Sequence, residues 1–270
     1  MGLRYHPQGL EPGPETVYVG PAPRLAVSVA GAGHLVLLLH GIRGNRGNWS
    51  PQLAAFAGRF KVAAWDARGF GDSDDYEGWL QFEHLIGDVL RVAQHFRADR
   101  MHLVGLAMGG RIARHVALRH PERLLSLTMI STNPGFDALS VDEVRRFVTE
   151  RRTRTPATVA ALLGSRAVPG ALAEVERSVA QLREHSYLKI LEASVAQDRA
   201  APIEQIRVPT LVISGEEDRV LPVALARETA RRIPGAELVT LPGVGHFPNL
   251  EQPERFNEIV LSFLEKHDQP

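Results

Sequence analysis

The stretch Met101–Ala113 constrains the fold of this chain more than any other. Its apolar run ends at Gly105, and after three more residues come Gly109 and Gly110. Helical spacing of apolar side chains begins directly afterwards, at Ile112. Glycine allows a sharp backbone turn and lets a helix pack closely against a strand. The stretch therefore predicts a strand, a tight turn and a helix in direct succession.

The rest of the chain repeats this alternation of strands and helices. Runs such as Leu35–Leu39 are apolar at every position, which is typical of strands buried on both faces of a parallel sheet. Helical patterns separate the runs, as at Phe82–Phe96. The pattern predicts an α/β fold with a doubly wound, mostly parallel sheet of eight strands. The expected strands are Thr16–Val19, Arg24–Ala30, Leu35–Leu39, Lys61–Trp65, Met101–Gly105, Leu124–Ile130, Thr210–Ser214 and Glu237–Leu241.

Between residues 133 and 207 the strand-like runs stop. Ser140 and Glu143 have the spacing of a capping box, which starts a helix. Pro156, Pro169 and Gly170 then divide shorter helical patterns. We expect residues 133–207 to be a helical cap inserted into a core made of residues 1–132 and 208–270.

Composition excludes several classes of function. The 270 residues carry 31 basic and 31 acidic side chains, so no overall basic field attracts nucleic acid or a membrane surface. The absence of cysteine excludes thiol catalysis, disulfides and cysteine metal sites. No signal peptide or membrane-length apolar run is visible, so we expect a cytoplasmic monomer or homodimer that acts on a small molecule.

The turn at Gly105-x-Ala107-x-Gly109 matches the G-x-S-x-G nucleophile elbow except at its centre. An elbow holds one side chain above the end of the sheet, and that residue is expected to be serine. An acid and a histidine should follow on loops after later strands. Asp218 and His246 occupy those places, where the carboxylate would orient the imidazole as a general base. Taken singly, each would more readily be a capping carboxylate or a surface histidine.

Acyl transfer also requires hydrogen-bond donors for an oxyanion. We assign these to the backbone amides of Ile42, in the loop after Leu35–Leu39, and Met108. His40 is expected to be structural. Arg43 could bind a carboxylate with its forked guanidinium, or turn outward and pair with Asp72, Asp74 or the cap.

Two aromatic residues complete the candidate substrate site. Trp49 could line the pocket or belong to the core, and the core is the more common place for such a residue. Tyr187 has helical spacing with Leu188 and Leu191, which predicts the apolar underside of the cap.

These motifs together resemble the α/β-hydrolase superfamily, in the branch of capped carboxylesterases, lactonases and carbon–carbon bond hydrolases. The matching segments are His40-Gly41, Asp66-x-Arg68-Gly69-x-Gly71-x-Ser73, Gly105-x-Ala107-Met108-Gly109-Gly110, Gly215-x-x-Asp218 and Gly245-His246-Phe247. The resemblance implies a Ser-His-Asp hydrolase of an ester, lactone, amide or carbon–carbon bond, with neither a metal nor an organic cofactor. Families with an aspartate nucleophile, the haloalkane dehalogenases and epoxide hydrolases, are excluded by Ala107.

Ala107 is the one departure from this pattern, and three interpretations account for it. Alanine can be a substitution that inactivates a serine hydrolase and traps its substrate. The protein can instead be a natural receptor or pseudoenzyme. It can also use the His246–Asp218 pair without a nucleophile, as cofactor-independent oxygenases or lyases of similar fold do. The first is favoured, because every other part of the expected constellation is present.

Overall fold

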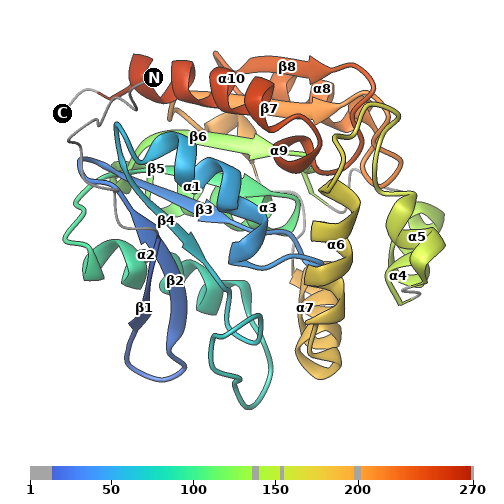
Figure 1. Cartoon of the computed structure of the whole chain (residues 1–270), viewed down its shortest axis with the longest axis horizontal. Coiled ribbons are helices and arrows are strands. Elements are labelled where there is room, and N and C mark those ends of the chain that lie inside the picture. The colour runs from blue at the N-terminus through green and yellow to red at the C-terminus, as the bar shows by residue number, and fades with distance from the viewer. Residues whose placement is uncertain (1–13, 136–139, 153–154, 198–201, 269–270) are drawn as a thin grey trace, which may run out of the picture.

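The computed structural model describes residues 14–135, 140–152, 155–197 and 202–268. In these ranges, eight strands form one sheet in the order β1-β2-β4-β3-β5-β6-β7-β8 (Figure 1). β1 pairs antiparallel with β2, and β2 with β4, while all the other pairs are parallel. The predicted sheet is thereby confirmed. The strands are β1 (Glu15–Val19), β2 (Leu25–Ala30), β3 (Leu35–Leu39), β4 (Lys61–Trp65), β5 (Met101–Leu106), β6 (Leu124–Ile130), β7 (Thr210–Gly215) and β8 (Glu237–Leu241).

β3 shows why the central strands are apolar throughout. Its side chains alternate between the two faces of the sheet, as they do in any strand. Leu35, Leu37 and Leu39 join one hydrophobic cluster, and Val36 and Leu38 join another. A polar residue at any of these positions would be buried, so the continuous run follows from burial on both faces.

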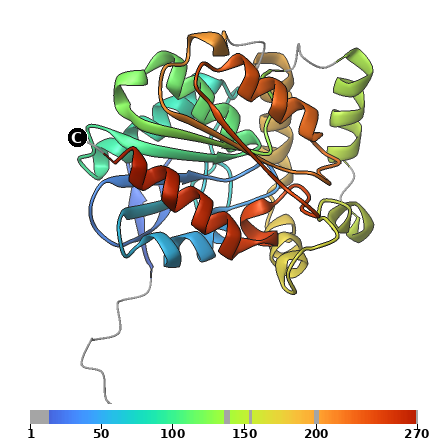
Figure 2. The same cartoon turned by 90° about the horizontal axis from the view of Figure 1, so that it is seen from above.

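Helices cover each face of the sheet. On one face α1 and α10 pack together, and Figure 2 shows α10 in red beside α1 in blue. On the other face α2 and α3 bury their apolar stripes. The helices of the core are α1 (Ser50–Phe56), α2 (Phe82–His95), α3 (Met108–Arg119), α8 (Val223–Arg232), α9 (Pro248–Glu251) and α10 (Pro253–Lys266).

The described residues between β6 and β7 form helices and no strand. These helices are α4 (Val141–Arg152), α5 (Pro156–Ala160), α6 (Ala171–Ala180), α7 (Glu184–Gln197) and the short 3₁₀ helix Ile203–Gln205. In Figure 1 α4 to α7 lie beyond the end of the sheet toward which β6 points. Val175 of α6 and Tyr187 of α7 contribute to the clusters on opposite faces of the sheet. The segment is therefore packed onto the core at two places.

A polar network joins Asp268, near the C-terminus, to the strands in the middle of the sheet. Its Oδ1 lies 2.6 Å from Nδ1 of His34 and 3.2 Å from Nε2 of His102. The other ring nitrogen of His102 lies 2.8 Å from Oγ of Ser126. Since His102 and Ser126 are fully buried in β5 and β6, this network holds Asp268 against the middle of the sheet.

Candidate active site

The turn after β5 holds Ala107 in a strained backbone conformation. Its φ is 49° and its ψ is −106°, a region that residues with a Cβ rarely adopt. Three hydrogen bonds hold the residue there. Its amide donates to the carbonyl of Ile130 (2.8 Å), and its carbonyl accepts from the Thr132 hydroxyl (3.1 Å) and the Arg111 amide (3.1 Å).

The glycines of this turn are required by close packing. A Cβ on Gly109 would collide with the carbonyl oxygen of Leu39, and one on Gly105 with the carbonyl oxygen of Gly109. Glycine at these positions lets the start of α3 rest directly on β3 and β5. The predicted strand, tight turn and helix are therefore confirmed in detail.

His246 and Asp218 meet behind the turn. Nδ1 of His246 lies 2.9 Å from Oδ2 of Asp218, and both residues are buried. Oδ1 of Asp218 accepts the amides of Val220 (2.8 Å) and Leu221 (2.9 Å). Burial alone would raise the pKa of Asp218, but the interaction with His246 and these hydrogen bonds outweigh it and hold the pKa below its usual range. The carboxylate of Asp218 is thus ionised. Because it binds Nδ1 of His246, the other ring nitrogen, Nε2, remains available to a ligand in the cavity that His246 lines.

The loop after β3 brings its backbone against Ala107. A Cβ placed on Gly41 would lie 3.4 Å from the Cβ of Ala107. Ile42 is the next residue, and Met108 is the first residue of α3, whose amide belongs to the group that a helix leaves without an internal partner. Both residues line the same cavity as Ala107, which is the arrangement that the expected oxyanion donors need.

His40 has its ring fixed by the backbone. One ring nitrogen lies 2.8 Å from the carbonyl oxygen of Gly41, and Nε2 accepts the amide of Ala67 (3.0 Å). Burial lowers the pKa of His40, so the ring is neutral and shapes the loop.

Glu251 is a buried residue that sequence patterns did not single out. Its Oε2 accepts the amides of Gly164 (2.7 Å) and Gly245 (2.8 Å), and its Oε1 accepts that of Phe247 (2.9 Å). Gly245 and Phe247 flank His246, and Gly164 follows α5. One carboxylate thus connects the histidine loop to the segment between β6 and β7. The signal in the sequence was an acid soon after a glycine-rich loop, whose amides need an acceptor.

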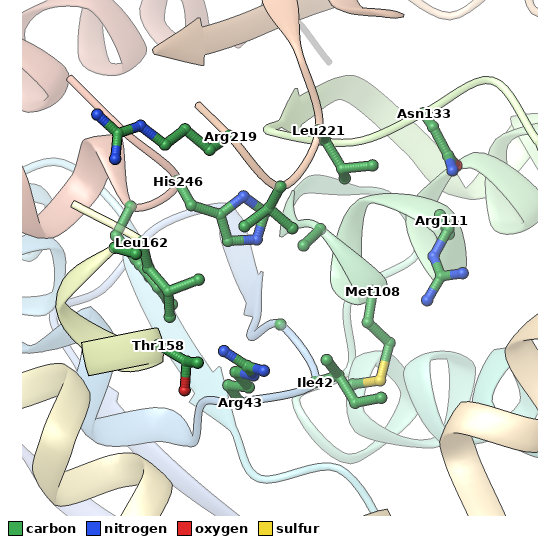
Figure 3. A pocket seen from close by; sticks show the side chains of 15 residues that line it. Ile42, Arg43, Met108, Arg111, Asn133, Thr158, Leu162, Arg219, Leu221 and His246 are labelled. Carbon is green, nitrogen blue, oxygen red and sulfur yellow. The ribbon is translucent and has the colours of Figure 1, made fainter. Parts of the chain in front are cut away.

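A cavity of about 270 Å³ joins these parts (Figure 3). Its walls come from the ends of the parallel strands and from the α5 region, and they are mainly apolar. Asn133 and Arg111 lie on one side in Figure 3, and Arg219 and Leu162 lie on the other. The described lining residues are Gly41, Ile42, Arg43, Ala107, Met108, Arg111, Asn133, Thr158, Ala161, Leu162, Arg219, Val220, Leu221, His246 and Phe247.

Arg43 lines the cavity and is only 8% exposed. Its carbonyl accepts the hydroxyl of Ser178 in α6 (3.0 Å), which ties the loop after β3 to that helix. The two carboxylates considered as its outward partners are bound by other arginines. Asp72 is bound by Arg46, and Asp74 by Arg24. Arg43 itself belongs to the wall of the cavity.

Trp49 and Tyr187, both expected at the substrate, are absent from the described lining of the cavity. Trp49 is fully buried and packs with the cluster of α1 and α10. Tyr187 is 1% exposed and packs with the cluster on the opposite face of the sheet. The placement of both residues in the substrate site is therefore corrected, because their rings are used to fill the core.

Within the described ranges, no group of three or more histidine, cysteine or acidic side chains is arranged to hold a metal ion. No helix of the same ranges has the length and apolar character needed to cross a membrane.

Comparison with known proteins agrees with this geometry. A relative named as the carbamate hydrolase RutD, from Azorhizobium caulinodans, is 30% identical over 91% of this chain and 96% of its own length. The enol-lactonase of Burkholderia xenovorans superposes with a TM-score of 0.78 at 28% identity, over 90% of this chain and 96% of the other. A malate-bound esterase of Thermogutta terrifontis gives 0.80 at 26%, over 94% and 100%. A family model for the α/β hydrolase fold matches residues 34–253. The chain therefore belongs to the α/β hydrolase fold family.

Proposed function

We propose that the cavity is a serine-hydrolase site whose nucleophile position carries alanine. The observation that carries this proposal is the buried His246–Asp218 pair, 2.9 Å apart, in the cavity that Ala107 lines. Such a pair serves to take a proton from a neighbouring hydroxyl. Serine at position 107 would supply that hydroxyl.

The mechanism follows from the position of each group. Nε2 of His246 would remove the proton from a serine hydroxyl at position 107 as its oxygen attacks the carbonyl carbon. Asp218 would hold the imidazole in the correct tautomer and stabilise its charged form. The amides of Ile42 and Met108 would donate to the oxyanion, and His246 would then return the proton to the leaving group.

Alanine at position 107 fits a hydrolase that lacks only its nucleophile. Serine and alanine differ by one oxygen, so the change disturbs little of the packing around the turn. The strained backbone, the ionised Asp218 and the oxyanion loop all remain in place.

The proposed substrate is a small organic molecule with an ester, lactone, amide or carbamate bond, or an activated carbon–carbon bond. A cavity of about 270 Å³ suits a molecule of modest size. The names of the relatives, a carbamate hydrolase and an enol-lactonase, support acyl chemistry of this kind. We further propose that residues 133–207 act as a cap that controls access, because Thr158, Ala161 and Leu162 contribute to the cavity wall.

The test is the Ala107→Ser variant, assayed with aryl esters and lactones. Loss of a triad nucleophile costs on the order of a millionfold in rate, so the serine form should exceed the alanine form by several orders of magnitude. In the serine form, Asp218→Asn should lower turnover by roughly ten-thousandfold through the wrong tautomer. A serine form as inert as the parent across these substrates would refute the proposal.

The alanine itself supports a second candidate, a member of the family that binds a small molecule without hydrolysing it, or that uses the His246–Asp218 pair alone. This candidate predicts ligand binding by the Ala107 chain together with an inert Ala107→Ser form. The same pair of assays therefore separates the two functions.

A further inference from the structure

The chain leaves β6 through a second strained residue, next to the turn at Ala107. Ser131 has a φ of 43°, and its amide donates to the carbonyl of Ile213 (2.9 Å). Thr132 follows and donates its hydroxyl to the carbonyl of Ala107 (3.1 Å). Strain of this kind persists only where the surroundings hold the backbone firmly. The hydroxyl of Thr132 thus holds the segment after β6 against the turn at Ala107.

Asn133 is positioned by this segment. Its main-chain carbonyl accepts Nη1 of the fully buried Arg114 (2.8 Å), which fixes the residue from the side of α3. Its side chain lines the cavity on the same side as Arg111, with His246 between it and Arg219 in the view of Figure 3. The amide therefore faces the space that a substrate would occupy.

The side-chain amide of Asn133 makes no hydrogen bond within the part of the chain that the structure describes. The residue is 1% exposed, and neither Oδ1 nor Nδ2 has a hydrogen-bond partner among the described residues. Buried amides are nearly always satisfied, and an unsatisfied one opposes folding. Both atoms are unsatisfied, so neither orientation of the amide gives the side chain a partner among the described residues.

We propose that Asn133 is a specificity subsite for a planar substrate group that carries a carbonyl oxygen and an N–H, as in a carboxamide, a carbamate or a urea. Nδ2 would donate to the carbonyl oxygen while Oδ1 accepts the N–H. An ester offers no donor to Oδ1, and a carboxylate places an acceptor against it. This inference rests on the proposed function, in that the cavity is the substrate site.

The test uses three ethyl esters on one four-carbon skeleton: ethyl succinamate, ethyl methyl succinate and monoethyl succinate. The Ala107 chain is used for binding by calorimetry, and the Ala107→Ser form for hydrolysis. Two neutral hydrogen bonds should favour the carboxamide over the diester by about tenfold to a hundredfold in affinity. Asn133→Leu, which is similar in size, should abolish that preference, and Asn133→Asp, which keeps the acceptor for the N–H but loses the donor to the carbonyl oxygen, should reduce it.

The melting temperature of the Asn133→Leu variant distinguishes a ligand-binding role of Asn133 from a structural one. Replacing an unsatisfied buried amide with an apolar group is neutral or favourable, so Asn133→Leu should keep or raise the melting temperature. The matched control is Asn249→Leu, at a buried asparagine outside the described cavity lining. Nδ2 of Asn249 donates to the carbonyl of Asn48 (2.9 Å), so this variant should melt lower with ligand preference unchanged.

Each outcome separates this inference from the proposed function. Equal affinity of the parent chain for the carboxamide and the neutral diester, or a fall in the melting temperature of Asn133→Leu equal to that of the control, would overturn the subsite. An inert Ala107→Ser form with a selective Ala107 chain would overturn the hydrolase proposal and leave the subsite standing.

Discussion

Glu251→Gln should loosen the loop that carries His246. The glutamate accepts three backbone amides, two at Oε2 and one at Oε1. Glutamine retains one oxygen, which can take the place of Oε2 and keep the amides of Gly164 and Gly245. Its NH₂ group then faces the amide of Phe247, so one buried donor loses its acceptor.

The structure sets the size of this effect. One buried donor without a partner costs about 1–3 kcal/mol. For a chain of this length that corresponds to a fall in melting temperature of roughly 3–9 °C. Glu251→Leu abandons all three amides and should cost more than about 3 kcal/mol. Urea denaturation of both variants measures the difference, with Glu254→Gln, at an exposed position of α10, as the control.

The pH dependence tests the same residue independently. Burial raises the pKa of Glu251, and the amide hydrogen bonds only partly oppose this. The folded protein therefore holds that proton more tightly than the unfolded chain. The resulting stabilisation is complete below the ordinary value of 4.5 and is lost as the pH rises through the folded pKa.

Glu251→Gln has no such titration, so its deficit relative to the parent should be largest in acid and shrink toward neutral pH. A deficit that grows toward neutral pH would mean that the three amides favour the ionised carboxylate. An unchanged stability in Glu251→Gln would show that these contacts do not hold the loop.

Three further predictions concern the cavity and the C-terminus. In the Ala107→Ser form, His246→Ala should abolish ester hydrolysis, whereas retained turnover would mean that another group is the base. Arg43→Leu should weaken binding of an acidic ligand by about tenfold to a hundredfold and spare a matched neutral one, as calorimetry would show; an equal effect on both would assign Arg43 to loop structure. Asp268→Asn should cost at most about 1 kcal/mol near neutral pH. That cost should fade in acid, because the hydrogen bonds with His34 and His102 outweigh the effect of burial and hold the Asp268 pKa below its usual value; a deficit independent of pH would contradict this assignment.

The sequence predicts those parts of the molecule that local patterns determine. Leu35–Leu39 is apolar at every position because the strand is buried on both faces, and Gly105 and Gly109 are required by the contact of α3 with the sheet. The order of position 107, Asp218 and His246 along the chain also predicts which residues meet.

Other parts of the site depend on contacts between distant segments. An apolar spacing looks the same in a core and in a pocket wall, so Trp49 and Tyr187 could not be assigned from their patterns. Glu251 is notable for the backbone amides that it binds, and Asn133 for the hydrogen bonds that its buried side chain lacks. Both properties arise only in the folded chain. A local pattern can suggest the amides of Gly245 and Phe247, which lie close to Glu251 in sequence, but not that of Gly164, which comes from a separate loop.

At position 107, the residue that would give the most stable backbone differs from the residue that would supply a nucleophile. A positive φ of 49° is a burden of about 1–3 kcal/mol for any residue with a Cβ, and glycine would relieve most of it. Serine would have the same backbone strain but would supply the hydroxyl nucleophile. Alanine carries the same burden and supplies no hydroxyl. Ala107→Gly should therefore give the more stable protein and Ala107→Ser the more active one, and the present chain has neither advantage.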